Sequence, residues 1–179
     1  MRSLYSFLFV LSLFCVQAQK INITQLEVEK LTRPLGLDTQ NPDFSWIIKS
    51  DEHNLSQTHY QIFVATDKIF SKKSLLWDSG KVNSSESVYV KYQGKPLDYA
   101  TKYYWTVKVW TNQSSRSRQS GVSFWTTGMM SSENWKSEWI GVDDEDKRVK
   151  NSPYFTNDFK VDNQITSAQL FITSRGIYE

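Results

Sequence analysis

The sequence predicts an all-β protein folded as a two-sheet sandwich, on three observations. Apolar and polar residues alternate with a period of two through most of the chain, and no segment shows the period of an amphipathic helix. Aromatic residues make up 15% of the chain, with only seven glycines and four prolines, a composition that suits packed strands. About seven strand-like segments fall within roughly 105 residues, the spacing expected of strands in a sandwich.

The segment from residue 96 to residue 110 narrows this prediction to one kind of sandwich. It contains a strictly alternating strand in which Tyr103, Trp105 and Val107 share one face. A tyrosine at the start of such a strand can turn its hydroxyl back onto the backbone a few residues upstream, as in immunoglobulin-like and fibronectin type III-like domains. We therefore predict that fold, with Trp46, Tyr103 and Trp105 as structural residues of its core.

Turn residues separate the expected strands from one another. The strands are expected at residues 21–31, 44–49, 59–65, 75–80, 87–92, 103–110 and 121–127. Residues 113–119 are polar and are expected to form a hairpin loop. In the last strand, alternation turns Val122 and Phe124 inward, so Trp125 is expected on the outer face.

Residues 1–18 have the features of a secretory signal peptide. Met1 and Arg2 precede an apolar run, and the run ends in a small-residue cleavage site at residues 16–18. The run is shorter than the roughly 20 residues that a membrane-spanning helix needs, so we expect an exported protein, periplasmic or extracellular, without a membrane span. Cys15 is the sole cysteine and would leave with the signal peptide, so the mature chain would fold without a disulfide.

The charge of the chain does not indicate a polyanionic partner. The formal net charge is +2, and the basic residues are scattered along the sequence. Neither a nucleic acid nor an anionic membrane is therefore expected to bind.

Three regions are expected after the signal peptide. Residues 19–128 form the sandwich, and residues 129–151 form a linker in which Trp135 and Trp139 pack. Residues 152–179 contain two more alternating segments that resemble the first strands of another β domain. Two strands cannot form an independent domain, so this region is either incomplete or docked onto the sandwich.

Six motifs go beyond the general features of a β-sandwich. They are Pro34–Asp38, Pro42–Trp46, Gln57–Ile62, Trp77–Gly80, Tyr103–Trp105 and Trp135–Gly141. In order and spacing they resemble the amino-terminal region of secreted bacterial α-L-rhamnosidases of glycoside hydrolase family 78. Residues 168–172 and 176–179 look like the opening of the next module of that family, so 152–179 is expected to begin an incomplete jelly-roll-like domain.

The resemblance implies that this chain is a non-catalytic part of a larger enzyme. Members of that family hydrolyse terminal α-L-rhamnose from glycans with inversion, in a downstream (α/α)₆ barrel that is absent from this chain. Inversion requires two carboxyl groups roughly 6.5–9.5 Å apart. Because no motif here matches that active site, the chain alone is expected to be inactive, to need no cofactor and to have downstream modules of the same polypeptide as partners.

Individual residues that could carry chemistry are better explained by structure. Asp78 is expected to cap a turn rather than to act as a general acid. The acidic run Asp143–Asp146 lacks the spacing of a calcium loop, and His53 and His59 alone make a poor zinc site. We therefore predict no catalytic, cofactor-binding or metal-binding residue.

Outward-facing aromatic residues remain as candidates for a functional surface. Phe63, Tyr104 and Trp125 are expected to form an exposed patch on neighbouring strands, joined by Trp135 and Trp139. The favoured interpretation is a seam against the next module; the other is a platform on which a rhamnose-containing glycan stacks. Two alternatives to the enzyme fragment follow: a free-standing carbohydrate-binding module and a purely structural spacer.

Overall fold

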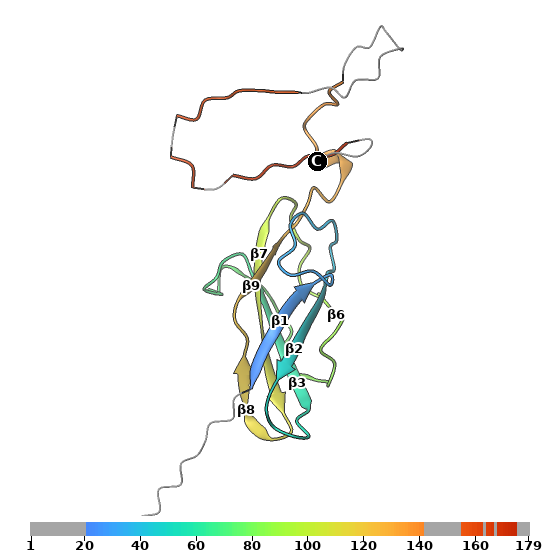
Figure 1. The fold of residues 1–179 in the computed structure, drawn as a ribbon, viewed down its shortest axis with the longest axis vertical. Helices are drawn as coiled ribbons and strands as arrows, with labels where there is room; N and C mark the ends of the chain where they lie inside the picture. The colour runs from blue at the N-terminus through green and yellow to red at the C-terminus, as the bar shows by residue number, and fades with distance from the viewer. Residues whose placement is uncertain (1–20, 142–154, 163, 167, 175–179) are drawn as a thin grey trace, which may run out of the picture.

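The computed structural model describes residues 21–141, 155–162, 164–166 and 168–174, and it shows a β-sandwich (Figure 1). The predicted all-β immunoglobulin-like architecture is confirmed. A short 3₁₀ helix, η1 (Ser132–Asn134), follows the sandwich. The strands of the described residues are β1 (Asn22–Val28), β2 (Asp43–Lys49), β3 (Gln57–Ala65), β4 (Leu75–Asp78), β5 (Val82–Asn83), β6 (Val90–Lys91), β7 (Lys102–Thr111), β8 (Ser114–Gln119) and β9 (Ser123–Thr126).

The strands form two antiparallel sheets. The smaller sheet has the order β1-β2-β6, and the larger has the order β4-β3-β7-β8, with β5 also paired to β3 and β9 to β7. The β3–β7 ladder is continuous from His59 opposite Trp110 to Ala65 opposite Tyr104. In Figure 1, β1 and β2 lie in front of β7, and the chain leaves the sandwich at its upper end.

One predicted loop is a strand in the structure. Residues 113–119 were expected to be a hairpin loop, but β8 pairs with β7 through Lys108 opposite Gln119 and Val109 opposite Arg118. A β-ladder is held by backbone hydrogen bonds, so a polar strand at the edge of a sheet needs no apolar face. The strand predicted at residues 87–92 is shorter in the structure, because only β6 pairs with β2 there.

Side chains of both sheets meet in one aromatic core. The predicted structural residues are buried: Trp46 is 1% exposed, and Tyr103 and Trp105 are fully buried. Phe44 lies at the centre, with its ring 4.6 Å from that of Trp105. The buried apolar residues of the cluster are Ile23, Val28, Phe44, Trp46, Tyr60, Ile62, Val64, Val90, Tyr92, Leu97, Tyr103, Trp105, Val107, Val109 and Trp125.

The predicted orientation of the last strand is wrong. Trp125 is fully buried and Phe124 is only half-buried, whereas Val122 is 42% exposed. The reason lies in pairing, because β9 places Trp125 opposite Tyr103 of β7 and paired residues point to the same face. Both alternate sets of residues in this strand contain bulky side chains, so the sequence pattern alone did not distinguish them.

Trp46 joins the two sheets through a buried hydrogen bond. Its indole Nε1 on β2 donates to the Oε1 of Gln57 on β3 at 3.0 Å. The Gln57 amide nitrogen in turn donates to the backbone carbonyls of Ser84 and Glu86, at 3.1 and 2.6 Å. Trp46 therefore fills the core and satisfies its own polar atom at the same time.

The predicted tyrosine corner is present. The Tyr103 hydroxyl accepts a hydrogen bond from the backbone N–H of Asp98 at 2.7 Å. The Asp98 carbonyl accepts a second bond, from the hydroxyl of Thr127 at 2.6 Å. The corner thus ties the chain before β7 to the residue that follows β9.

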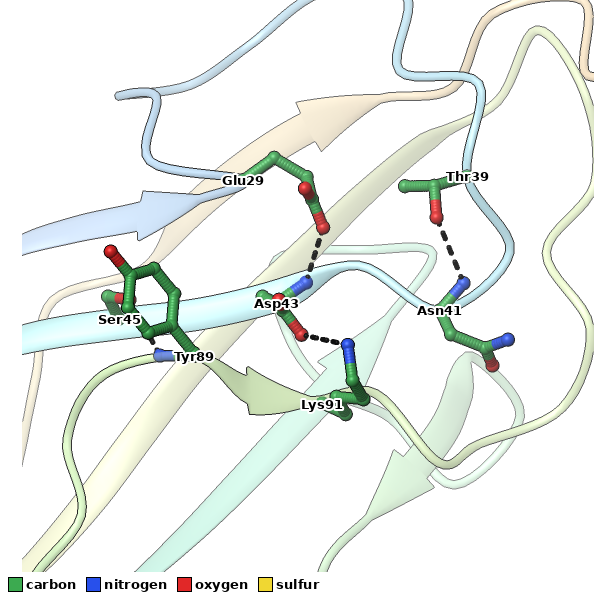
Figure 2. Close-up of polar contacts among 7 residues, drawn as sticks. All are labelled: Glu29, Thr39, Asn41, Asp43, Ser45, Tyr89 and Lys91. Carbon is green, nitrogen blue, oxygen red and sulfur yellow. Dashed lines mark hydrogen bonds and ion pairs between the residues drawn. The ribbon is translucent and has the colours of Figure 1, made fainter.

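Polar contacts hold the smaller sheet where the chain enters β2 (Figure 2). Glu29 accepts from the backbone N–H of Asp43 at 2.7 Å, and the Asp43 carbonyl accepts from the Glu29 N–H at 2.9 Å. The Asp43 carboxylate also pairs with Lys91 of β6 at 3.0 Å, and the Ser45 hydroxyl accepts from the Tyr89 N–H at 3.1 Å. Both neighbours of β2 are therefore tied to it near this entry.

The regions flanking the sandwich match the expectations only in part. Residues 1–18, the predicted signal peptide, lie outside the described residues. Trp135 is half-buried and Trp139 is 62% exposed, so the packing of these two tryptophans within a linker stays a prediction. The described residues within 155–174 form no strand, because no neighbouring strand supplies a ladder to either predicted segment. Within the described part of the chain, no helix is long and apolar enough to cross a membrane.

We expect Trp46→Ala to lower the free energy of unfolding by about 3–5 kcal/mol, because it leaves a large cavity and removes the donor to the buried Gln57 Oε1. Urea denaturation followed by tryptophan fluorescence measures this loss. Trp139→Ala is the matched control, and its effect should stay within about 0.5 kcal/mol because this tryptophan is exposed. Equal effects of the two substitutions would contradict the core position of Trp46.

Tyr103→Phe should cost about 1 kcal/mol of stability, since it removes the corner hydrogen bond and keeps the buried ring. The measurement is the same denaturation experiment. An unchanged midpoint would show that the corner contributes nothing to stability.

Candidate functional site

A row of aromatic side chains lies on the outer face of the larger sheet. Phe63 comes from β3, Tyr104 and Trp110 from β7, and Phe124 from β9, and all four are half-buried. They alternate with core residues, so strand geometry directs them away from the sandwich interior. The rings of Tyr104 and Phe124 lie opposite each other in the ladder, with their centres 6.4 Å apart.

Lysine or arginine side chains lie within cation–π distance of all four rings. The shortest contact places the Lys102 ammonium 4.0 Å from the centre of the Phe124 ring. The other contacts are Arg33 to Phe124 at 5.5 Å, Lys68 to Tyr104 at 5.9 Å, Lys102 to Tyr104 at 5.6 Å, Lys81 to Trp110 at 4.8 Å and Lys108 to Phe63 at 4.9 Å. We call these four rings and five cations the cationic aromatic face.

The cationic aromatic face has an excess of positive charge. The ladder places Asp78 of β4 opposite Phe63, Asp67 directly precedes Lys68, and Asp38 lines the same cavity as Lys102, so three carboxylates lie near the five cations. The Asp78 carboxylate accepts hydrogen bonds from the Gln61 amide at 2.7 Å and from the Gly80 N–H at 2.9 Å, which confirms that Asp78 caps a turn. The cations therefore outnumber the carboxylates near them.

The fold gathers cations that are scattered in the sequence. Arg33 and Lys68 lie on loops, and Lys81 follows the turn after β4, yet all three reach the same face. The sequence does contain one signal for this face: on β7, Lys102, Tyr104, Lys108 and Trp110 are separated by even numbers of residues. The prediction of an outward aromatic patch used that alternation for the rings and not for the lysines that lie beside them.

The structure separates the five predicted patch residues. Phe63 and Tyr104 lie on the cationic aromatic face as expected, whereas Trp125 is in the core. Trp135 and Trp139 lie beyond β9, where the chain leaves the sandwich. The residues predicted to form one patch therefore lie in three places: on the cationic aromatic face, in the core and in the exit region.

A network of backbone hydrogen bonds holds this exit. The loop Pro34–Asp38 runs beside residues 126–130, with the Leu37 N–H donating to the Thr126 carbonyl and the Gly128 N–H donating to the Leu37 carbonyl, both at 2.9 Å. The Asp38 carboxylate accepts from the Met130 N–H at 2.8 Å. We call these two paired segments the exit clamp.

Gly128 allows the exit clamp to close. A Cβ atom at this position would collide with the Asp38 carboxylate and would lie 2.9 Å from the Gly36 carbonyl oxygen. Gly36 itself has a φ of +73°, a conformation that suits glycine. Two glycines and one carboxylate therefore set the path on which the chain leaves the sandwich.

A cavity of about 690 Å³ adjoins the exit clamp. Leu35, Lys102, Met129 and Trp135 line it from the sandwich side, and residues 168–173 line it from the other. The later part of the chain thus returns to the end of the sandwich, next to one cation of the cationic aromatic face.

Four titratable groups among the described residues have shifted pKa values, and burial is the first cause for the three tyrosines, Tyr60, Tyr92 and Tyr103. Burial, and secondarily the nearby Tyr103, raise the pKa of the Tyr92 hydroxyl to about 12, and this hydroxyl donates to the Lys95 carbonyl at 2.8 Å. Hydrogen bonds, first that with Ser74, lower the pKa of Asp67 in the loop after β3. The Tyr92 hydroxyl and the Asp67 carboxylate are both parts of local turns.

Among the residues that the structure describes, no group of three His, Cys, Asp or Glu side chains could hold a metal ion. The acidic run Asp143–Asp146 lies outside them. His59 donates to or accepts from the Thr58 hydroxyl at 3.1 Å and lies edge-on to Trp110.

The two-sheet arrangement, the tyrosine corner and the aromatic core define an immunoglobulin-like sandwich module. A family model described as the N-terminal immunoglobulin domain of Rha78A-like proteins matches residues 23–131, which is most of the chain. The protein belongs to this family. The match ends within the exit region, just before η1.

The similar proteins of known function are α-L-rhamnosidases. One from Formosa agariphila is 32% identical over 96% of this chain, and one from Streptomyces avermitilis is 39% identical over 68% of it. The chain covers 21% and 12% of these two relatives, so it spans about a fifth of their length or less. What it matches is their N-terminal immunoglobulin-like portion.

Solved structures show the same fold. The α-L-rhamnosidase of Streptomyces avermitilis, crystallised with L-rhamnose, has a TM-score of 0.65 and 38% identity over 69% of this chain and 12% of its own. The α-L-rhamnosidase of Dictyoglumus thermophilum has a TM-score of 0.62 and 39% identity over 67% of this chain and 14% of its own. These values confirm the resemblance that the six motifs predicted.

We expect Gly128→Ala to destabilise the sandwich by about 1–3 kcal/mol, because the new methyl group displaces Asp38 or the Gly36 backbone. Thermal unfolding of the chain measures this effect. Gly121→Ala is the matched control: nothing lies within 4 Å of its added carbon, so stability should be unchanged or slightly raised. A loss in the control as large as that of Gly128→Ala would contradict the proposed steric cause.

Proposed function

We propose that this chain is the non-catalytic N-terminal portion of an exported α-L-rhamnosidase, with residues 1–18 as its signal peptide. The observation that supports this most directly is the family match over residues 23–131, together with relatives of which the chain covers about a fifth. The full polypeptide would hydrolyse terminal α-L-rhamnose from glycans with inversion, and the reacting carboxyl groups would lie downstream.

Within that enzyme, the role of the sandwich is to orient the following module. The exit clamp holds the chain from Thr126 to Met130 in one path, and its rigidity comes from paired backbone groups and from the Asp38 carboxylate. Leu35 is 76% exposed beside the cavity that Trp135 lines, so an apolar surface is available there. We assign the seam to this exit region, with Leu35, Trp135 and Trp139 as its apolar residues.

The similarity to the Formosa agariphila relative supports a second module after the exit. It covers 96% of the chain and therefore continues past residue 131, where the family model ends. Residues 155–174 expose apolar side chains such as Phe159 and Leu170, as the first strands of a domain would before their partner strands are added. We propose that they begin the jelly-roll-like module.

A free-standing carbohydrate-binding module is the second candidate function. The cationic aromatic face supports it, because half-buried rings on a flat sheet are suited to stack on sugars. In this alternative the chain would bind glycans without any attached hydrolase. The two candidates agree on the sandwich and differ on whether catalysis occurs elsewhere in the polypeptide.

The test compares this 179-residue chain with the product of the whole reading frame that encodes it. With an aryl α-L-rhamnoside, the longer product should release L-rhamnose, first seen by NMR as the β anomer, and the chain alone should release none. A longer product without activity, or a chain that hydrolyses by itself, would overturn the proposal.

A further inference from the structure

We propose that the cationic aromatic face binds an anionic polysaccharide, one whose sugars carry carboxylate or sulfate groups. The choice of a saccharide rests on the proposed function, whereas the requirement for negative charge comes from the face itself. Nothing in the family match assigns a ligand to this surface. The site would hold the glycan that the attached enzyme degrades.

The charge of the face selects an anionic ligand. Five cations lie against its rings, and the neighbouring carboxylates are already hydrogen-bonded to backbone N–H groups: Asp78 to Gly80, Asp67 to Ile69 and Phe70, and Asp38 to Met130. Four of these cations, Arg33, Lys68, Lys81 and Lys102, are exposed, and the flexible stem of a lysine allows its ammonium to move from a ring to an acidic group. A chain with acidic groups at intervals supplies the missing charges without removing the ammonium groups from water.

The rings supply the other half of the recognition. Tyr104 and Phe124 form a pair with centres 6.4 Å apart, and Phe63 lies on the adjoining strand. Trp110 lies six residues from Tyr104 on β7, so the row extends about 20 Å along the sheet. This length suits several sugar units in a row rather than one monosaccharide, and the apolar faces of the sugars can lie on the rings.

Burial of the same face in a seam is less favourable. A seam against an apolar surface would remove five cations from water, at a cost of several kcal/mol for each one left unpaired. The exit region, by contrast, offers Leu35 and Trp135 beside residues 168–173. The structure thus provides apolar side chains for the next module at the exit region, which adjoins the cationic aromatic face at Lys102, and leaves the rest of that face to a hydrated ligand.

Isothermal titration calorimetry of the 179-residue chain tests the proposal. The probe is a tetrasaccharide of alternating L-rhamnose and galacturonic acid, and its control is the same tetrasaccharide with the carboxyl groups reduced to neutral galactose. We expect measurable binding of the acidic form, weakened strongly between about 0.05 and 0.5 M NaCl, and at least about tenfold weaker binding of the neutral form.

Two double variants locate the site. Lys68→Gln/Lys108→Gln removes two cations that lie against Tyr104 and Phe63, away from the exit cavity, and should weaken binding about tenfold. Lys49→Gln/Lys95→Gln removes the same charge from exposed positions elsewhere and should leave affinity unchanged. Equal losses in both variants, equal affinity for both tetrasaccharides, or no binding of either would overturn the proposal.

An acidic protein surface as the true partner would give a different pattern. The tetrasaccharides would not bind, and Lys68→Gln/Lys108→Gln would lower the melting temperature of the longer polypeptide but not that of the chain alone. Failure of the rhamnosidase proposal is distinguished separately, because the calorimetric signal does not depend on hydrolysis. Binding by the chain with no activity in the longer product would sustain this inference and reject that function.

Discussion

The antiparallel ladder between β3 and β7 is the constraint on which the rest of the structure depends. It pairs His59 to Ala65 with Tyr104 to Trp110, and the alternation of side chains divides both strands between two environments. One set builds the core around Ile62 and Trp105. The other set forms the cationic aromatic face, so core packing and candidate function follow from a single register.

The β3–β7 ladder also positions the tyrosine corner and the exit clamp. Tyr103 lies at the start of β7, and its hydroxyl holds Asp98, whose carbonyl accepts from Thr127 just after β9. The exit clamp begins at that point, with Gly128 packed against Asp38. The most buried aromatic residues are thereby connected, through a few hydrogen bonds, to the path along which the chain continues. The proposed role of orienting a following module requires such a connection, because a flexible exit would not fix the orientation of that module.

The sandwich has two surfaces of different chemistry, the exit region and the cationic aromatic face. The exit region presents Leu35 and Trp135 beside Lys102 and beside Asp38, whose carboxylate is hydrogen-bonded to the Met130 N–H, and its apolar side chains suit burial against protein. The face of the larger sheet combines rings with five cations, which suits contact with a hydrated anionic chain. Burial of an unpaired charge is costly. The charge of each surface therefore distinguishes burial against protein from contact with an anionic chain more clearly than the positions of the aromatic residues do.

Local pattern was enough to establish the sandwich, its main strands, the core positions of Trp46, Tyr103 and Trp105, and the family resemblance, since alternation and turn residues are properties of short segments. Pairing between strands decided the rest. Trp125 is in the core because of its partner Tyr103, polar β8 is a strand because of backbone bonds to β7, and the cations of three loops meet on one face because the sheet brings them together. The partners of Trp125 and of these cations lie far away in sequence, and the hairpin of β7 and β8 has no apolar pattern in its second arm, so only the folded chain could reveal these contacts.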